Sequence, residues 1–174
     1  MAEARNTPPV ELPEGMAIVL RDSMESLSPG EKEQLYGFVG RRAVDHKFRH
    51  RFKEGMRFYL LKQDEALLCY VWCISGYSYD GFTPMADSDV YMLDGGCLVA
   101  QRYKGRFYHL MMGVRHLLGE QGAGHCLFAT HARNKSMIRC AEKIHFSHRG
   151  SVFHCKIFGR DLNLWRLDKR RPKV

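Results

Sequence analysis

The sequence of 174 residues lacks long apolar runs, metal-binding spacings and a secretory leader. No segment approaches the roughly 18–20 consecutive apolar residues that a membrane-spanning helix needs. There is no CxxC pair, and the spacings among Cys140, His145, His148, His154 and Cys155 match no standard zinc site. The first residues contain no apolar stretch of the kind that a signal peptide requires. These absences exclude a spanning helix and a zinc module, and we expect no metal.

Cysteine placement argues against a disulfide framework. Most of the cysteines lie inside apolar runs such as LLCYVWC and GHCLF, a placement that favours buried, reduced thiols. Reduced thiols are typical of the cytoplasm, so we expect a cytoplasmic protein. The six are Cys69, Cys73, Cys97, Cys126, Cys140 and Cys155.

Acidic residues are outnumbered, with 19 Asp and Glu against 27 Lys and Arg and a formal net charge of +8. Such a charge favours anionic partners, among them nucleotides, phosphates and acidic carrier proteins. The segment Arg41–Arg57 is rich in lysine and arginine. It fits a docking face for an acidic carrier protein and, equally, a solvated helix flank.

The length predicts one domain with a proper core. Residues 1–15 are polar and contain proline, so we expect a loose leader there, a single domain over residues 16–168, and a basic tail at 169–174. Within the domain, strand-like and helix-like patterns follow the order β-α(α)-β-β-β-α-β-α-β(β), which indicates a mixed α/β sheet.

Local signals place several elements along this order. Ser28, followed by proline and by Glu31, predicts a capped helix start, and we expect that helix to run past Arg41. MRFYLLKQ and EALLCYVWCISG, separated at Gln63-Asp64, predict a β-hairpin, and a second hairpin is expected to turn at Arg149-Gly150.

The stretch VAQRYKGRFYH (99–109) joins the apolar strand DVYMLDGGCLVA to an amphipathic helix. Gly105 allows close approach of the backbone, Lys104 and Arg106 add positive charge, and a helix start offers free N–H groups. The loop therefore suits a pyrophosphate, although a plain strand-to-helix connection accounts for the same residues. It matches neither GxGxxG nor a Walker loop.

This stretch resembles the acyl-CoA pyrophosphate loop of the GNAT superfamily of N-acyltransferases, commonly V-x-P-x-Y-R-G-K-G-I-G. Phe107 and His109 depart from it, because they stand where the family prefers glycine. A second run, HARNKSMIRCAEKIHFSHRG, resembles the family's N-x-x-S/A-x-R-x-x-E-K-x-G-F segment, with His145 in place of its glycine. The matching residues are Val99, Tyr103, Lys104, Gly105, Arg106, Asn134, Ser136, Arg139, Glu142, Lys143 and Phe146.

The resemblance implies a central mixed, mostly antiparallel sheet of about six or seven strands, flanked by about four helices. It implies that the family's fourth and fifth strands splay at a bulge, where Gly95-Gly96 stands here, and that pantetheine lies in the gap. It also implies an acyl-CoA co-substrate, acetyl or longer, whose acyl group passes to a primary amine by direct attack in a ternary complex. The implied donor contacts are Cys97, Leu98, Val99, Lys104, Gly105, Arg106, Phe107, Tyr108, Asn134 and Ser136.

Catalysis of this kind needs a base for the amine and an acid for the thiolate. Asp94 lies close to where the family often places a carboxylate, either as that base or as a structural or substrate-binding acid. The family's usual acid is a tyrosine at the position of Ala141, so the candidates are Tyr108, His131, Cys140 and His109. Positioning of amine and thioester would supply part of the rate.

Three alternatives stay open. Phe107, several methionines and the basic Arg41–Arg57 segment would also suit an acyl-carrier-protein donor with a longer chain. YKGRF resembles the basic-Gly-aromatic ribonucleoprotein motif, yet it lies at a strand-to-helix junction, so we do not expect nucleic-acid binding. The third alternative is a relative that binds acyl-CoA but has no catalytic activity. The acceptor, a small-molecule or peptide amine, and the oligomeric state, a homodimer included, stay open.

Overall fold

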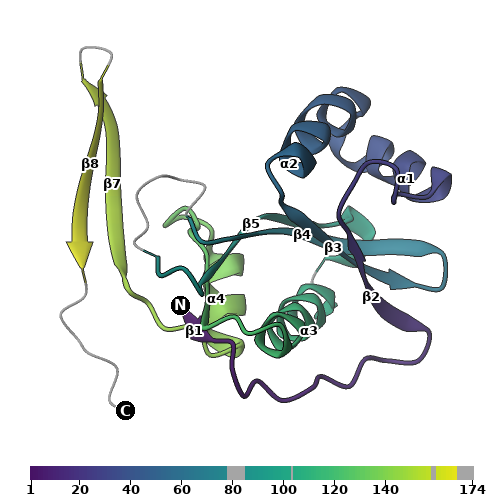
Figure 1. The fold of residues 1–174 in the computed structure, drawn as a ribbon, viewed down its shortest axis with the longest axis horizontal. Coiled ribbons are helices and arrows are strands. Elements are labelled where there is room, and N and C mark those ends of the chain that lie inside the picture. Colours follow the sequence, from purple (N-terminus) through teal and green to yellow (C-terminus); the bar gives the residue numbers. More distant parts are fainter. Residues whose placement is uncertain (78–84, 103, 158–159, 168–174) are drawn as a thin grey trace.

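The computed structural model describes residues 1–77, 85–102, 104–157 and 160–167 and contains a six-stranded sheet in the order β1-β6-β5-β4-β3-β2 (Figure 1). All neighbouring strands in it are antiparallel except β5 and β6, which are parallel. This confirms the mixed, mostly antiparallel sheet. The strands are β1 (Ala2–Glu3), β2 (Met16–Arg21), β3 (Arg57–Gln63), β4 (Ala66–Ser75), β5 (Val90–Cys97) and β6 (His125–Leu127).

Helices cover both faces of this sheet. In Figure 1, α1 and α2 lie on one face and α3 on the other. Within the described part of the chain, no helix is long and apolar enough to cross a membrane. The helices are α1 (Pro29–Val39), the π-helix η1 (Ala43–Phe48), α2 (Arg49–Lys53), the 3-10 turn η2 (Val99–Gln101), α3 (Arg106–Glu120) and α4 (Lys135–Lys143).

The sheet separates two hydrophobic cores, because successive residues of a strand point to opposite faces. In β3, Phe58 packs with Phe48 and Trp72 on the α1–α2 face, and the neighbouring Tyr59 packs with Leu110 on the α3 face. Since β3 and β4 are buried on both faces, their sequences read as nearly continuous apolar runs.

The first helix begins where its sequence predicts and ends earlier. The Ser28 hydroxyl accepts a hydrogen bond from the Glu31 N–H, and the Glu31 carboxylate accepts one from the Ser28 N–H, which confirms the capping box. The helix ends at Val39, because Gly40 adopts φ 88°. The expectation that it runs past Arg41 is therefore wrong, and a π-helix follows instead.

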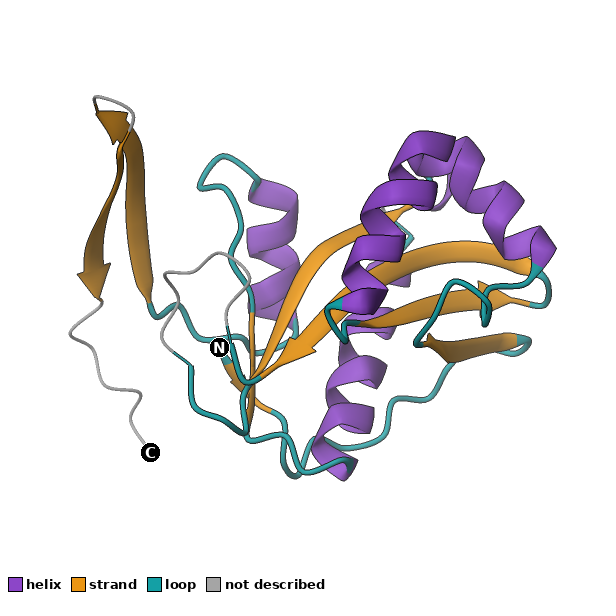
Figure 2. Ribbon diagram, turned by 45° about the horizontal axis from the view of Figure 1, so that its top comes forward, coloured by secondary structure: helices purple, strands orange, loops and turns teal. Residues whose placement is uncertain are grey.

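The two predicted hairpins have different outcomes. The chain turns between β3 and β4 after the register pair Gln63↔Ala66, which confirms the first hairpin. At the C-terminal end, Gly150 pairs with Leu167 and starts β7 (Gly150–Ile157), so the chain stays extended where a turn was predicted. Its antiparallel partner is β8 (Arg160–Leu167), which begins opposite Ile157. Figure 2 shows this two-stranded sheet beside the main body.

The N-terminal segment packs into the fold, in contrast to the loose leader expected from its composition. β1 pairs with β6, and Ala4 is 1% exposed. The Arg115 guanidinium donates hydrogen bonds to the Thr7 hydroxyl (3.1 Å) and to the Ile144 carbonyl (2.6 Å). One buried arginine thus joins the segment to α3 and to the end of α4. The basic tail (169–174) lies outside the described residues.

The sheet brings two cysteines together. Cys69 and Cys97 are register partners on β4 and β5, with Cα atoms 4.0 Å apart, and form a disulfide. The expectation of reduced thiols is wrong for this pair, because they are 28 residues apart in sequence and only the pairing of the strands makes them neighbours. Cys73 and Cys126 are buried free thiols.

Two helical glycines test the packing of the N-terminal segment. A Cβ at Gly119 in α3 would collide with the Ala4 carbonyl, whereas a Cβ at Gly37 in α1 meets nothing within 4 Å. We expect Gly37→Ala to raise the free energy of unfolding by about 0.5–1 kcal/mol, through helix propensity alone. Gly119→Ala should lower it despite the same propensity gain. Urea unfolding of both variants measures this, and stabilisation by Gly119→Ala would contradict the packing.

Candidate active site

A β-bulge lies in the middle of β5. Tyr70 pairs with Gly96 and Trp72 with Leu93, so Asp94 and Gly95 together oppose the single residue Val71. Asp94 adopts φ 47°, a left-handed conformation that aspartate tolerates better than most residues. This confirms the expected irregularity in the strand, which involves Asp94 and Gly95 where Gly95-Gly96 was expected.

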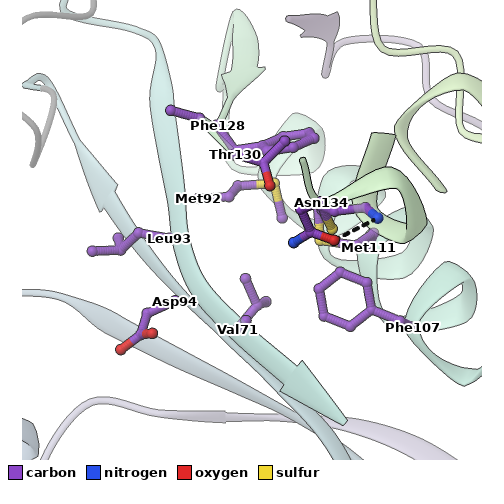
Figure 3. Close-up of a pocket in the computed structure, with 12 residues that line it drawn as sticks. Val71, Met92, Leu93, Asp94, Phe107, Met111, Phe128, Thr130 and Asn134 are labelled. Carbon is purple, nitrogen blue, oxygen red and sulfur yellow. Dashed lines mark hydrogen bonds between the residues drawn. The ribbon is translucent and has the colours of Figure 1, made fainter. Parts of the chain in front are cut away.

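β5 and β6 separate two residues before this bulge. Within the described residues they pair at Val90↔Cys126 and Tyr91↔Leu127, and a cavity of about 190 Å³ lies next to the unpaired part of β5. Figure 3 shows Asp94 on one side of β5 and Phe107 and Asn134 on the other. The strands therefore splay as expected, with a space between them. It is lined by Val71, Met92, Leu93, Asp94, Gly95, Phe107, Met111, Phe128, Ala129, Thr130, Asn134 and Met137.

Asp94 is held from the α2 side by two cations. Lys47 Nζ and Arg51 Nη1 both donate to Asp94 Oδ2 at 2.7 Å. Arg51 is 2% exposed, and its guanidinium lies 5.2 Å from the ring centre of Trp72, whereas Lys47 and Asp94 are about half exposed. Burial raises the pKa of Asp94, but the Lys47 and Arg51 contacts outweigh it and hold the pKa below its usual value. Asp94 is therefore an anion at neutral pH and a weak base.

The start of α3 has the form of an anion site. Gly105 adopts φ 72° as the N-cap, and no side chain caps this end. The first backbone hydrogen bond of the helix runs from His109 to Gly105, so the preceding N–H groups have no partner inside the helix. Lys104 is exposed, and Arg106 reaches back to Met16 Sδ at 3.4 Å. Tyr103 lies outside the described residues.

Phe107 stands at a position where the pyrophosphate loop of the GNAT superfamily has glycine, and its side chain projects toward the bulge. A Cβ at Gly95 would lie 2.7 Å from Cζ of the Phe107 ring. On the other face, a Cβ at Gly96 would lie 3.2 Å from the Phe38 ring. Both glycines are needed because an aromatic ring packs on each side of the strand. Phe107 narrows the cavity from the α3 side.

The other expected donor contacts lie around the same region. Cys97 is in the disulfide, and the Leu98 N–H donates to the Leu68 carbonyl at 2.9 Å. Val99 begins the η2 turn. Asn134 lines the cavity and accepts from the Met137 N–H at 3.2 Å, as an N-cap, while Ser136 is exposed on α4.

The acid candidates lie away from the cavity lining. Tyr108 packs edge-on to His109, and His131 accepts from the Arg133 N–H in the turn before α4. Burial raises the pKa of the Cys140 thiol, so it is protonated at neutral pH. Burial and the Arg106 charge lower the pKa of His109. Of the candidate catalytic residues, Asp94 alone is among the residues that line the cavity.

Sequence reasoning missed the partners of Asp94. Lys47 and Arg51 belong to the basic segment Arg41–Arg57, but helical spacing there gives no sign that two of its cations turn toward β5. Phe128 in the lining was also missed, since such a residue is typical of a core. Met92 and Met111, two of the methionines that the sequence offered for a longer acyl chain, do line the cavity. Among the described residues, no group of three or more His, Cys, Asp or Glu is placed to hold a metal ion.

Solved structures with a similar architecture include aminoglycoside N-acetyltransferases and a putative acetyltransferase from Pyrococcus furiosus. AAC(6')-Iy, bound to a bisubstrate analogue of CoA, superposes with a TM-score of 0.60 at 13% identity, over 82% of this chain and 97% of its own. AAC(6')-Ih from Acinetobacter baumannii gives 0.60 at 13% identity, over 82% and 98%. The metagenomic soil enzyme meta-AAC0020, bound to sisomicin, gives 0.58 at 10% identity, over 84% and 98%.

The chain shares the fold of these acetyltransferases. No protein-family model and no curated protein sequence matches it. The fold expected from the two sequence runs is confirmed, including the mixed sheet and the splayed strands.

The Asp94 cluster makes stability depend on pH. Because the folded pKa is lower than that of a free aspartate, about 3.9, the cluster stabilises the fold fully above that value. The contribution is lost as pH falls through the folded pKa. We expect the stability advantage of the parent protein over Asp94→Asn to be present at pH 6 and to close toward pH 3, measured by urea unfolding. The exposed Asp87, changed to Asn, is the control, and a pH-independent advantage at Asp94 would contradict the prediction.

Proposed function

We propose that the protein transfers an acyl group from an acyl-CoA thioester to a primary amine in a ternary complex. The observation that carries this is the cavity between β5 and β6, bordered by the bulge at Asp94 and by the start of α3. A GNAT-like fold with this gap presents a thioester to an amine. The acetyltransferases of like fold support acetyl-CoA as the donor, and their aminoglycosides support a small amine as acceptor.

The start of α3 would bind the donor's pyrophosphate. Its unpartnered N–H groups and the positive end of a 15-residue helix attract an anion, with Lys104 adding charge. The left-handed Gly105 lets the loop approach closely. Phe107 and His109 do not remove N–H groups, since each keeps its own, but their side chains narrow the approach.

The pantetheine arm would enter between β5 and the turn before α4. Among the described residues, β5 pairs with β6 no further than Tyr91, so its backbone from Met92 on is free on that side to pair with the arm's amides. Phe107 and Asn134 line this entry. The apolar Met92 and Met111 surround the inner end, which suits the acyl chain.

The chemical step needs a neutral amine. The bound ammonium loses a proton to water, and the neutral nitrogen attacks the thioester carbonyl and forms the C–N bond. The C–S bond then breaks to release the thiolate, and the extra proton on the nitrogen passes to the thiolate to give the amide and the CoA thiol. The two cations make Asp94 a weak base, so we propose that it binds the incoming ammonium and orients it. Holding amine and thioester together supplies much of the rate. Tyr108, His131 and Cys140 stay proposals for the acid.

A charge reversal at the loop tests the donor site. We expect Lys104→Glu to weaken CoA and acetyl-CoA binding about tenfold, because an attractive phosphate contact becomes repulsive. Isothermal titration calorimetry measures it, and CoA should also raise the melting temperature of the parent protein. Lys143→Glu, on the exposed end of α4, is the control and should bind normally. Failure of every thioester and of CoA to bind would exclude the acyltransferase.

An acyl carrier protein is the second candidate donor. An open depression on η1 and α2 is lined by one acid, Asp45, and by His46, Arg49, His50 and Lys53. Its two cations, Arg49 and Lys53, suit an acidic carrier. Arg49→Glu should then weaken transfer from acyl carrier protein and leave transfer from acyl-CoA unchanged. No transfer from acyl carrier protein by the parent would exclude the carrier, and an unchanged rate of that transfer in Arg49→Glu would exclude this surface as its docking site.

A further inference from the structure

The cavity has a donor side and an acceptor side. Phe107 and Asn134 approach it from α3 and α4, while Asp94 projects to the opposite side of β5, toward α2 (Figure 3). If the donor enters at the start of α3, as proposed above, the amine must arrive from the α2 side. The chemistry of Asp94 and its partners then selects the acceptor, and this inference rests on the proposed function.

The α2 side carries an excess of positive charge at the cavity. Asp94 Oδ2 accepts from both Lys47 and Arg51, so two cations meet at one carboxylate oxygen. Asp45, which is nearby in sequence, accepts from the Tyr36 hydroxyl at 2.9 Å. An acceptor made only of ammonium groups would meet Lys47 as a like charge.

The two cations are not equivalent. Arg51 is 2% exposed and packs against Trp72, so it is held in place beneath Asp94. Lys47 is 50% exposed and ends a long flexible side chain. It can leave Oδ2 and bind another anion without exposing Arg51, because Arg51 keeps its own bond to Asp94.

We propose that the acceptor is a small amine that carries a carboxylate beside the amine, as an amino acid does. Its ammonium would bind the Asp94 carboxylate and its carboxylate would bind Lys47, so that both charges of the ligand meet an opposite charge. The aminoglycosides of the structurally similar enzymes are larger polycations and fit this cluster less well.

Matched acceptors test the proposal. With acetyl-CoA as donor and thiol release as readout, we compare phenylalanine with 2-phenylethylamine and leucine with isopentylamine, and add kanamycin as a polycation. Each pair differs only by the carboxylate. We expect kcat/KM to be at least about tenfold higher for the amino acid of each pair. Equal or higher values for the simple amines or for kanamycin would overturn the proposal.

Variants of Lys47 assign the preference to this side chain. Lys47→Gln should reduce the amino-acid preference to about one, because kcat/KM falls more for phenylalanine than for 2-phenylethylamine. Lys47→Arg should restore the preference, since it restores the charge. Lys32→Gln, on α1, is the matched control and should keep it. A preference that survives Lys47→Gln would overturn the assignment.

Calorimetry separates this proposal from the proposed function. CoA binding is measured first, and its absence refutes the acyltransferase irrespective of the acceptor. Phenylalanine and 2-phenylethylamine are then titrated into the parent protein and into Lys47→Gln, with and without CoA. If phenylalanine binds more tightly than 2-phenylethylamine and the difference is lost in Lys47→Gln, the proposed acceptor class is supported. If the two amines bind equally, the acceptor class is overturned even when no turnover is seen.

Discussion

One extra residue in β5 controls the arrangement of the site. Because Asp94 and Gly95 oppose the single Val71, β5 bends within the sheet, as strands do at bulges. Pairing with β6 extends only to Tyr91, and a cavity lies beyond it. The same bulge places the Asp94 carboxylate on the α2 side. The opening for a donor and the charged group for an acceptor thus have a common backbone origin.

The bulge is supported from both faces of the sheet. Phe107 from α3 and Phe38 from α1 pack so closely on Gly95 and Gly96 that neither position has room for a Cβ without displacement. Arg51 binds the Asp94 carboxylate from beneath while its guanidinium lies over Trp72. A buried arginine needs a partner for its charge, which here is the Asp94 carboxylate. Through Arg51, the left-handed Asp94 is therefore held against Trp72 in the aromatic core. Donor and acceptor sides are therefore coupled through one rigid segment.

Local signals in the sequence were reliable where a feature depends on neighbouring residues. The Ser28 capping box, the β3–β4 hairpin and the Asn134 cap all involve residues within a few positions of one another. Predictions failed where distant parts decide. Gly150 looked like a turn but pairs with Leu167, and the buried cysteines gave no sign that Cys69 would meet Cys97.

The sequence by itself determined the order of elements and the resemblance that led to the fold, because periodicity, caps and a basic glycine loop are short-range patterns. It also marked Asp94, Gly105 and Phe107 as positions of interest. Only the tertiary structure decided what surrounds them. Lys47 is 47 residues from Asp94, and Gly95 and Phe107 belong to different elements. Their contacts exist because the sheet aligns β5 with β4 and packs α2 and α3 on opposite faces, which no local pattern encodes.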